Sequence, residues 1–291
     1  MKLSKISAAI LLAALSNPQA VFATEIGNIV VTANNAKQNL ASVTAKTEVI
    51  TEQDIEEKQF QTLKDALQTV PGINLYNSGG PFLGTQIQIR GSSNSQVLIM
   101  VDGISINDPI GFGANLDNIS LQDIAQIEII KSPQAGIWGA NAAAGVINII
   151  TKSGQNSQQG NFSVEKGSFN SIKIASTLTA KSEQADFSLS ISHKSSNGYS
   201  SIILKDDDVN KNESDGYSQT DIGFNTGFNL TKDHRIELLF KDTNTESDYD
   251  AYGFPSDPND VNSNVTLSSQ LKKLQYVFQN DQLKARAYLS R

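Results

Sequence analysis

Two acidic stretches contain the residues in this sequence that are best suited to bind an ion. They lie at residues 194–217 and 242–266, and the second contains no Lys or Arg. Their carboxylates belong to Asp206, Asp207, Asp208, Glu213, Asp215, Asp242, Glu246, Asp248, Asp250, Asp257 and Asp260. Hard cations such as calcium bind to mobile clusters of oxygen ligands at about 2.4 Å. Neither stretch has EF-hand spacing, so two interpretations stay open: a calcium site or an ordinary solvated acidic loop.

The sequence supplies little for catalysis. It contains no cysteine, which excludes disulfide bonds and thiolate metal sites, and its two histidines, His193 and His234, are isolated. A soluble periplasmic enzyme is the alternative from another class, but it would need a nucleophile–base pair or a metal cluster, and neither is visible. The net charge of −7 argues against a nucleic-acid partner, because phosphates would not be neutralised.

The N-terminus has the pattern of an export signal. Lys2 and Lys5 precede an apolar run at residues 6–15, and Val21-Phe22-Ala23 has the small or β-branched residues of a signal-peptidase site. A run this short cannot cross a bilayer, which needs about 20 apolar residues. We expect residues 1–23 to be a cleaved signal peptide; the alternative is a buried N-terminal helix.

Residues 45–154 have the mixed pattern of a small α/β domain. Short helices are predicted where a Thr or Ser is followed three residues later by Asp, as in a capping box, at Thr51–Asp54, Thr62–Asp65 and Ser120–Asp123. Apolar residues at helical spacing follow Thr62, and Pro71-Gly72 ends that helix. Strands are predicted at residues 87–89, 97–101, 127–130 and 145–151.

From residue 155 onward the pattern changes to alternating apolar and polar residues. About seven segments of this kind, each near ten residues long, match the strands of a membrane β-barrel, although a soluble β-sandwich gives the same alternation. Short turns at 181–185, 231–234 and 280–282 alternate with the two long acidic stretches. Barrels with short periplasmic turns and long external loops have this arrangement, which favours the barrel.

Four blocks in order carry a resemblance to TonB-dependent outer-membrane receptors. Residues 25–33 resemble the TonB box, residues 51–75 resemble the opening of the plug domain, residues 88–103 its central signature, and residues 127–151 its closing signature. The resemblance divides the chain into a signal peptide (1–23), a TonB box with linker (24–44), a plug domain (45–154) and the beginning of a β-barrel (155–291).

The resemblance implies a fold and a non-enzymatic function. The expected fold is an α+β plug, a small mixed sheet with short helices, followed by the first strands of an antiparallel transmembrane β-barrel. The expected function is energised uptake of a large metal-chelate nutrient across the outer membrane of a Gram-negative cell. The implied partners are TonB of the TonB–ExbB–ExbD complex, outer-membrane lipid and the chelate, and the complete receptor is expected to be a monomer.

The segment expected to contact TonB consists of Glu25, Ile26, Gly27, Asn28, Ile29, Val30, Val31, Thr32 and Ala33. Strand addition needs a short segment with open backbone edges, and its centre is β-prone. An ordinary edge strand is the alternative interpretation. In the plug, Arg90, Asp102 and Glu128 resemble residues that lock the plug by ion pairs, whereas a solvated surface pair would contribute less than about 1 kcal/mol.

The cargo is predicted less specifically. Residues 76–80, 198–199 and 248–252 resemble the cobalamin (vitamin B12) transporters of the family, in which external loops bind calcium. That resemblance implies calcium ligands at Glu213, where the family has Asp, and at Asp215, Tyr249 and Asp250. It implies substrate contacts at Gly84, Gln86, Ser93, Gly111 and Phe112, of which only Ser93 keeps a similar polar type. A siderophore, another iron chelate or haem therefore stays open as cargo.

Residues 155–291 are too few for a complete barrel of this family. A plugged transporter resembles a barrel of about 22 strands. The segment would supply about 6 residues for each, whereas a tilted transmembrane strand needs about 9–11. We therefore expect the sequence to be the N-terminal fragment of a longer receptor.

Overall fold

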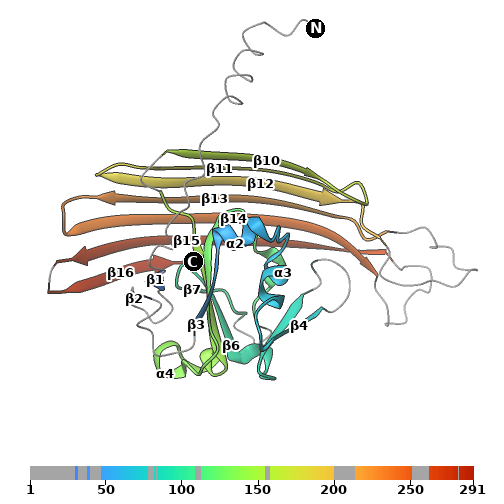
Figure 1. Cartoon of the computed structure of the whole chain (residues 1–291), viewed down its shortest axis with the longest axis horizontal. Coiled ribbons are helices and arrows are strands. Elements are labelled where there is room, and N and C mark those ends of the chain that lie inside the picture. Colours follow the sequence, from blue (N-terminus) through green and yellow to red (C-terminus); the bar gives the residue numbers. More distant parts are fainter. Residues whose placement is uncertain are drawn as a thin grey trace, which may run out of the picture.

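The computed structural model describes residues 30–31, 38–39, 47–77, 82, 84–108, 113–154, 158–199, 214–250, 262–280 and 282–291. A small mixed α/β domain lies against one face of a sheet of long antiparallel strands (Figure 1). We refer to residues 47–154 as the plug and to the long-stranded sheet as the wall. The fold class predicted from the sequence is confirmed.

Within the described residues, the plug is built on a five-stranded sheet with the order β3-β8-β9-β6-β7. Strands β6 and β9 are parallel, and the other neighbours are antiparallel. The strands are β3 (Thr47–Thr51), β6 (Val97–Val101), β7 (Ile104–Ser105), β8 (Ile124–Ile130) and β9 (Gly145–Thr151). A separate hairpin pairs β4 (Ile73–Asn77) with β5 (Thr85–Ile89), and β1 (Val30–Val31) pairs with β2 (Gln38–Asn39).

Capping boxes start two of the plug helices, as predicted. The Asp54 N–H donates to Thr51 Oγ1 (3.1 Å). The Asp54 carboxylate accepts from Thr51 Oγ1 (2.7 Å) and from the Thr51 N–H (3.0 Å), and these two hydrogen bonds lower the pKa of Asp54. Thr62 and Asp65 make the same reciprocal pair. The helices are α2 (Glu52–Glu57), α3 (Leu63–Gln68) and α4 (Ala135–Trp138), with 3-10 turns η2 (Asn94–Gln96), η3 (Leu116–Asn118) and η4 (Ala140–Ala142).

Branched apolar side chains fill the interior of the plug. Helix α3 contributes Leu63 and Leu67, which are fully buried, at the spacing of one helical face. Central strands β6, β8 and β9 contribute further buried residues, including Val97, Ile99, Ile127, Ile129, Ile147 and Ile149. Burial of apolar surface in this continuous cluster is what holds the plug strands and helices together.

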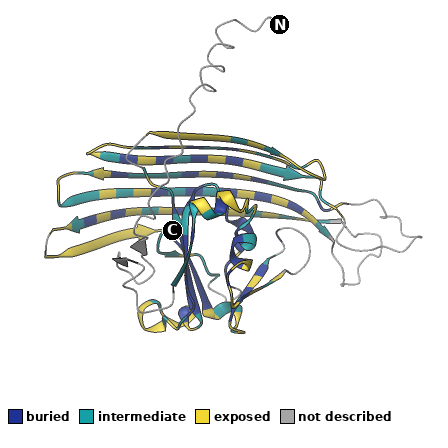
Figure 2. Ribbon diagram, in the orientation of Figure 1, coloured by how far each residue is buried: buried dark blue, intermediate teal, exposed yellow. Residues whose placement is uncertain are grey.

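The wall comprises seven antiparallel strands in sequence order within the described residues. They are β10 (Gln159–Lys166), β11 (Ile172–Lys181), β12 (Ala185–Ser196), β13 (Tyr217–Asn229), β14 (His234–Asp250), β15 (Asn262–Gln279) and β16 (Lys284–Ser290). Burial alternates along each central strand (Figure 2). Large apolar side chains such as Phe187, Ile191 and Leu274 are exposed on the face away from the plug. Serines, threonines and charged residues are buried on the plug side, so the alternation is that of a lipid-facing sheet rather than of a sandwich.

Two sequence predictions about local structure were wrong. Residues Ser120–Asp123 form a turn and not a helix. The predicted long loop at 242–266 is largely strand, because β14 continues to Asp250 and β15 begins at Asn262. The acidic residues Asp242, Glu246 and Asp248 therefore lie on β14, where polar residues alternate between the two faces of the sheet. In the part of the chain that the structure describes, no helix is long and apolar enough to cross a membrane.

Candidate functional site

The plug and the wall meet through polar side chains. A buried ion pair is the strongest of these contacts: Lys241 Nζ of β14 lies 2.6 Å from Asp123 Oδ1 and 2.7 Å from Oδ2. Both side chains are about nine-tenths buried, at 10% and 9% exposed. Gly223 on β13 makes room for the carboxylate, since a Cβ there would lie 3.0 Å from Asp123 Oδ2. Removing one partner of such a pair leaves the other buried and uncompensated.

A second contact joins η3 to β13 and β14. Gln219 Nε2 donates to Thr245 Oγ1 (2.8 Å), and Thr245 Oγ1 donates to Asn118 Oδ1 (2.8 Å). Within the plug, Asp117 of the same 3-10 turn accepts from Thr85 Oγ1 (3.0 Å) and pairs with a lysine of α3 at 2.6 Å. The turn is therefore tied both to the wall and to two elements of the plug.

A third contact surrounds Asp102, one of the predicted locking residues. Thr151 Oγ1 donates to Asp102 Oδ2 (2.6 Å), the Thr151 N–H donates to Asp102 Oδ1 (3.1 Å), and Asn225 Nδ2 of β13 donates to Thr151 Oγ1 (3.2 Å). Lys273 Nζ of β15 donates to the Asp102 backbone carbonyl (2.9 Å). Burial raises the pKa of the Asp102 carboxyl, and the Thr151 hydrogen bonds oppose that rise.

The other two predicted locking residues are placed differently. Arg90 is exposed with a φ of 53°, and its N–H donates to the Gly72 carbonyl (2.9 Å). The Arg90 guanidinium forms no ion pair with a residue that the structure describes. Glu128 is fully buried in the plug sheet and accepts hydrogen bonds from Gln126 Nε2 and Asn148 Nδ2. A locking role for these two residues stays a prediction.

The predicted substrate contacts lie around the β4–β5 hairpin, with two exceptions. Gly84 precedes β5 with a φ of 93°, Gln86 is exposed on β5, and Ser93 caps η2. Gly111 and Phe112 lie outside the described residues. None of these positions is tested as a binding residue by the structure.

Phe82, which sequence reasoning missed, attaches the segment before β5 to the wall. Its ring centroid lies 5.2 Å from that of Tyr217, and Lys194 Nζ lies 5.1 Å from the Phe82 centroid. Phe82 has a φ of 64° and is buried. Its position next to the first residue of β13 places this end of the plug beside the end of the wall that carries the long connections.

The four predicted calcium ligands are only partly described. Asp215 is fully buried and Tyr249 is half-buried near the end of β14, whereas Glu213 and the Asp250 side chain lie outside the described residues. A nearby pocket of about 430 Å³ is lined by oxygen-bearing side chains, including Glu246 and Asp248. Among the residues that the structure describes, no group of three or more His, Cys, Asp or Glu side chains is placed to hold a metal.

The segment predicted to contact TonB is described at two residues. Val30 and Val31 form β1, which pairs with Gln38 and Asn39 in antiparallel register. The rest of residues 25–33 and all of the predicted signal peptide lie outside the described residues. The strand character of Val30 and Val31 agrees with a β-prone centre, but contact with TonB stays a prediction.

Comparison with known proteins identifies relatives of both parts. Residues 39–146 match the family "TonB-dependent Receptor Plug Domain". The chain is 44% identical over 140 residues to the vitamin B12 transporter BtuB of Vibrio vulnificus. This match covers 48% of this chain and 23% of the relative. It is 34% identical over 173 residues to BtuB of Vibrio cholerae, and this match covers 59% of this chain and 28% of the relative. The chain thus spans about a quarter of the length of these relatives.

Solved structures share the arrangement of plug and wall. The siderophore receptor PirA from Acinetobacter baumannii superimposes with a TM-score of 0.68 at 20% identity, covering 86% of this chain and 40% of that chain. The ferric enterobactin receptor PfeA from Pseudomonas aeruginosa gives a TM-score of 0.66 at 21% identity, and the match covers 90% of this chain and 42% of that chain. At this identity the likeness concerns the fold alone. The family of the matched plug domain is non-enzymatic, which agrees with the absence of a catalytic motif in the sequence.

Proposed function

We propose that this chain, which carries the plug domain of a TonB-dependent receptor, is the N-terminal part of an outer-membrane transporter that takes up a large metal-chelate nutrient. The observation that carries the proposal is the placement of the plug on the polar face of the wall while the opposite face exposes large apolar side chains. An apolar outer face suits lipid, and a polar inner face suits a plug that must be released.

The polar contacts suit a plug that is held firmly at rest and released by force. Asp123 and Lys241 form a short, charge-assisted contact that fixes this side of the plug to β14. The hydroxyl and amide groups of Thr151, Asn225 and Gln219 can exchange their protein partners for water once the plug moves. In this mechanism Asp102 and the exposed Arg90 add to the lock, whereas Glu128 acts from within the plug sheet, where it is fully buried.

Force would reach the plug through residues 25–33. TonB, energised by the proton gradient through ExbB and ExbD, would add a strand to this segment and pull on the plug. The support for this step is the β-strand at Val30 and Val31, which precedes the plug in the sequence, and the plug-domain match itself.

Cobalamin is the cargo that we favour, with a siderophore, another iron chelate or haem as the alternative. Support for cobalamin comes from two BtuB relatives at 34–44% identity over about half of this chain. Support for the alternative comes from the structural neighbours, which are a siderophore receptor and a ferric enterobactin receptor. Cargo contacts are expected at Gln86 and Ser93, near the β4–β5 hairpin.

A single experiment tests energy coupling. Val30→Pro in the complete receptor removes a backbone donor that strand addition requires, and Val30→Ala keeps it. We expect Val30→Pro to bind cargo normally and to lose uptake, while Val30→Ala retains both. The measurement is binding and uptake of radiolabelled cyanocobalamin and, separately, of radiolabelled ferric enterobactin by whole cells. Undiminished uptake by Val30→Pro would contradict coupling, and the probe that the wild-type protein takes up decides the cargo.

Calcium in the external connections is a secondary proposal. The buried Asp215 carboxylate and the oxygen-lined pocket with Glu246 and Asp248 supply the hard ligands that calcium prefers. Glu213, Tyr249 and Asp250 would complete the ligand set implied by the resemblance. Calcium titration followed by isothermal calorimetry on the wild-type receptor and on Asp215→Asn tests it: equal heats would contradict the site.

A further inference from the structure

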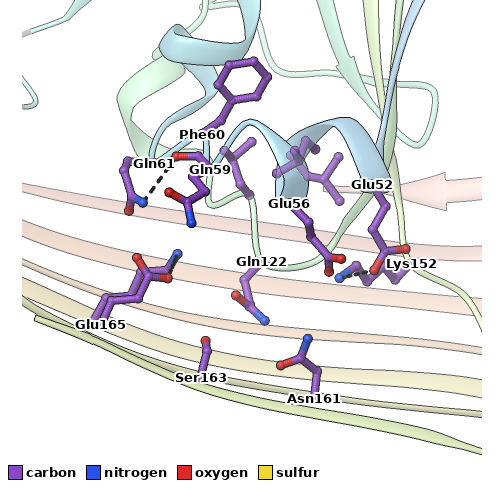
Figure 3. Close-up of a pocket in the computed structure, with 14 residues that line it drawn as sticks. Glu52, Glu56, Gln59, Phe60, Gln61, Gln122, Lys152, Asn161, Ser163 and Glu165 are labelled. Atoms are coloured by element: carbon purple, nitrogen blue, oxygen red, sulfur yellow. Dashed lines mark hydrogen bonds and ion pairs between the residues drawn. The ribbon is translucent and has the colours of Figure 1, made fainter. Parts of the chain in front are cut away.

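The plug is attached to the wall unevenly. Its contacts with β13, β14 and β15 include the buried Asp123–Lys241 ion pair and the hydrogen bonds of Gln219, Asn225 and Lys273. On the other side, helix α2 faces β10 and β11 across a cavity of about 410 Å³. Among the described residues that line this cavity, no hydrogen bond or ion pair crosses from α2 to β10. Figure 3 shows Glu52 and Glu56 of α2 on one side and Asn161, Ser163 and Glu165 of β10 on the other.

All the charged groups around the cavity except Glu56 are paired within their own halves, and Glu56 forms no ion pair with a residue that the structure describes. Lys152 Nζ lies 2.7 Å from Glu52 Oε1, and both residues belong to the plug. Lys173 Nζ lies 3.0 Å from Glu165 Oε1, and both residues belong to the wall. Moving α2 away from β10 therefore breaks neither ion pair and leaves no charge without its partner.

A single uncharged hydrogen bond between the plug and β11 lies at the edge of the cavity that is nearer to β13–β15. Gln122 Nε2 of the plug donates to Thr177 Oγ1 of β11 at 3.0 Å. Water can replace either partner of this bond, whereas separation at β14 must also break the short ion pair between Asp123 and Lys241 before water can solvate the two charges. Among the wall strands that the structure describes, the contact with the plug is consequently weakest along β10 and β11 beside α2.

The lining of the cavity indicates what could pass along it. Side-chain amides are contributed by Gln59, Gln61, Gln122 and Asn161, and a hydroxyl by Ser163, beside a limited apolar surface that includes Phe60. Acidic and basic groups are both present, and all of them except Glu56 are paired. Such a surface suits a large polar molecule that carries amide or hydroxyl groups, and it does not select strongly for either sign of charge.

We propose that cargo crosses the receptor along this cavity, which opens when α2 separates from β10–β11 while the plug stays attached at β13–β15. The inference rests on the proposed transport function and names the path that it uses. It requires a hinge-like displacement of the plug, with the Asp123–Lys241 side as the fixed edge, and not release of the plug as a whole.

The test uses cross-links on the two sides of the plug. Because the sequence contains no native cysteine, introduced cysteine pairs are the only thiols in this segment that can react with a cross-linker. Glu56→Cys with Ser163→Cys spans the cavity, and bismaleimides of increasing length identify the shortest reagent that joins them. The control pair, Ser120→Cys with Ser192→Cys, replaces two hydroxyls whose oxygens lie 3.4 Å apart where the plug meets β12. Binding and uptake are measured with radiolabelled cyanocobalamin, or with radiolabelled ferric enterobactin if the receptor takes up that probe.

We expect the cavity cross-link to abolish uptake while binding persists, and the control cross-link to leave both in place. Equal loss of uptake with both cross-links would overturn the proposal in favour of whole-plug release. Retained uptake with the cavity cross-linked would overturn it as well. Failure of the proposed function is a separate result: the untreated wild-type receptor would then take up neither probe.

A variant without cross-linking provides an independent check. Ser163→Phe places a bulky ring on the cavity side of β10, whereas Val164→Phe places the same ring on the exposed outer face. We expect Ser163→Phe to lower the uptake rate with unchanged binding and Val164→Phe to behave as the wild-type receptor. Equal uptake by both variants, with both present in the outer membrane at wild-type amounts, would contradict a path through the cavity.

Discussion

The interior of the plug and its interface with the wall are both buried, but by different chemistry. Interior positions such as Ile99, Ile127 and Ile147 are apolar and fully enclosed. At the interface, the buried groups are carboxylates, ammonium groups, hydroxyls and amides, and among the described wall residues Leu239 and Leu271 are the ones that join the apolar cluster of the plug. Apolar burial contributes about 25 cal/mol per Å² and is lost on contact with water, whereas polar groups regain hydrogen bonds there.

This difference separates two kinds of stability in one domain. The plug keeps its own fold through contacts that water disrupts, and it is held in the wall through contacts that water can replace. A domain built in this way can be moved against the wall by force without losing its internal structure. Variants that remove one kind of contact alone should change one kind of stability and leave the other unchanged.

The largest expected effect comes from a core truncation. Ile147→Ala on β9 removes a fully buried side chain and should lower the free energy of unfolding of the plug by about 2–5 kcal/mol. The control is Ile137→Ala on α4, where the side chain is 53% exposed and the expected change is within about 0.5 kcal/mol. Urea unfolding of the detergent-solubilised receptor measures both. Similar changes for the two variants would contradict an interior held by apolar burial.

An effect of comparable size is expected at the ion pair. Asp123→Ala leaves the Lys241 ammonium buried and unpaired, which costs about 3–5 kcal/mol when nothing relaxes and less when water enters. The double variant Asp123→Ala with Lys241→Met should recover most of that loss.

The loss should appear in the attachment of the plug and not in its interior. Amide hydrogen exchange should therefore rise along β14 and around Asp123 in the single variant, while the amide of Ile147 stays protected. Equal exchange behaviour of the single and double variants would show that the pair does not hold the plug to the wall.

Local features of this chain could be predicted from the sequence, and long-range ones could not. Thr51 and Thr62 start helices because a capping box involves residues three positions apart. The same rule failed at Ser120 and Asp123, where the Asp123 carboxylate binds Lys241, a residue 118 positions away in the sequence. Nothing within three residues reveals such a partner, so a tertiary contact overrode the local signal.

A signal for the interface was nevertheless present. Lys241 belongs to the inward row of β14, together with Thr243 and Thr245, and a lysine in a buried row requires a carboxylate nearby. Gly223 on the adjacent strand indicated close approach of another chain segment. Of the predicted locking residues, Asp102 lies against the wall through Lys273, whereas Arg90 forms no ion pair with a residue that the structure describes.

A pH effect at Asp102 is expected to be modest. Because burial raises the pKa of Asp102 in the folded protein, the folded state binds more protons than the unfolded state between the ordinary value of 3.8 and the raised value. The contribution of Asp102 to stability is therefore fully present below pH 3.8 and is lost as the pH rises through the raised pKa. Its slope cannot exceed about 1.4 kcal/mol per pH unit.

The measurement is the difference in unfolding free energy between the wild-type receptor and Asp102→Asn across this acidic range. Asn tolerates the φ of 48° at this position and keeps a hydrogen bond with Thr151. The variant should gain stability relative to the wild type as the pH rises. If the difference in unfolding free energy between the two proteins did not change with pH, the Asp102 carboxyl would not be desolvated in the folded protein.

The smallest effect is expected at a polar contact that serves the plug alone. Thr62→Ala removes the hydroxyl that accepts from the Asp65 N–H (3.2 Å) at the start of α3 and should lower the stability of the plug by about 1 kcal/mol. Gln61→Ala, one residue earlier and exposed, is the matched control. Because the cap acts on α3, which buries Leu63 and Leu67 in the interior, hydrogen exchange should increase in α3 and not along β14. Increased hydrogen exchange along β14 in Thr62→Ala would contradict this. It would mean that the stability of the plug interior and the attachment of the plug to the wall depend on each other, because a polar contact far from the wall would then loosen the wall.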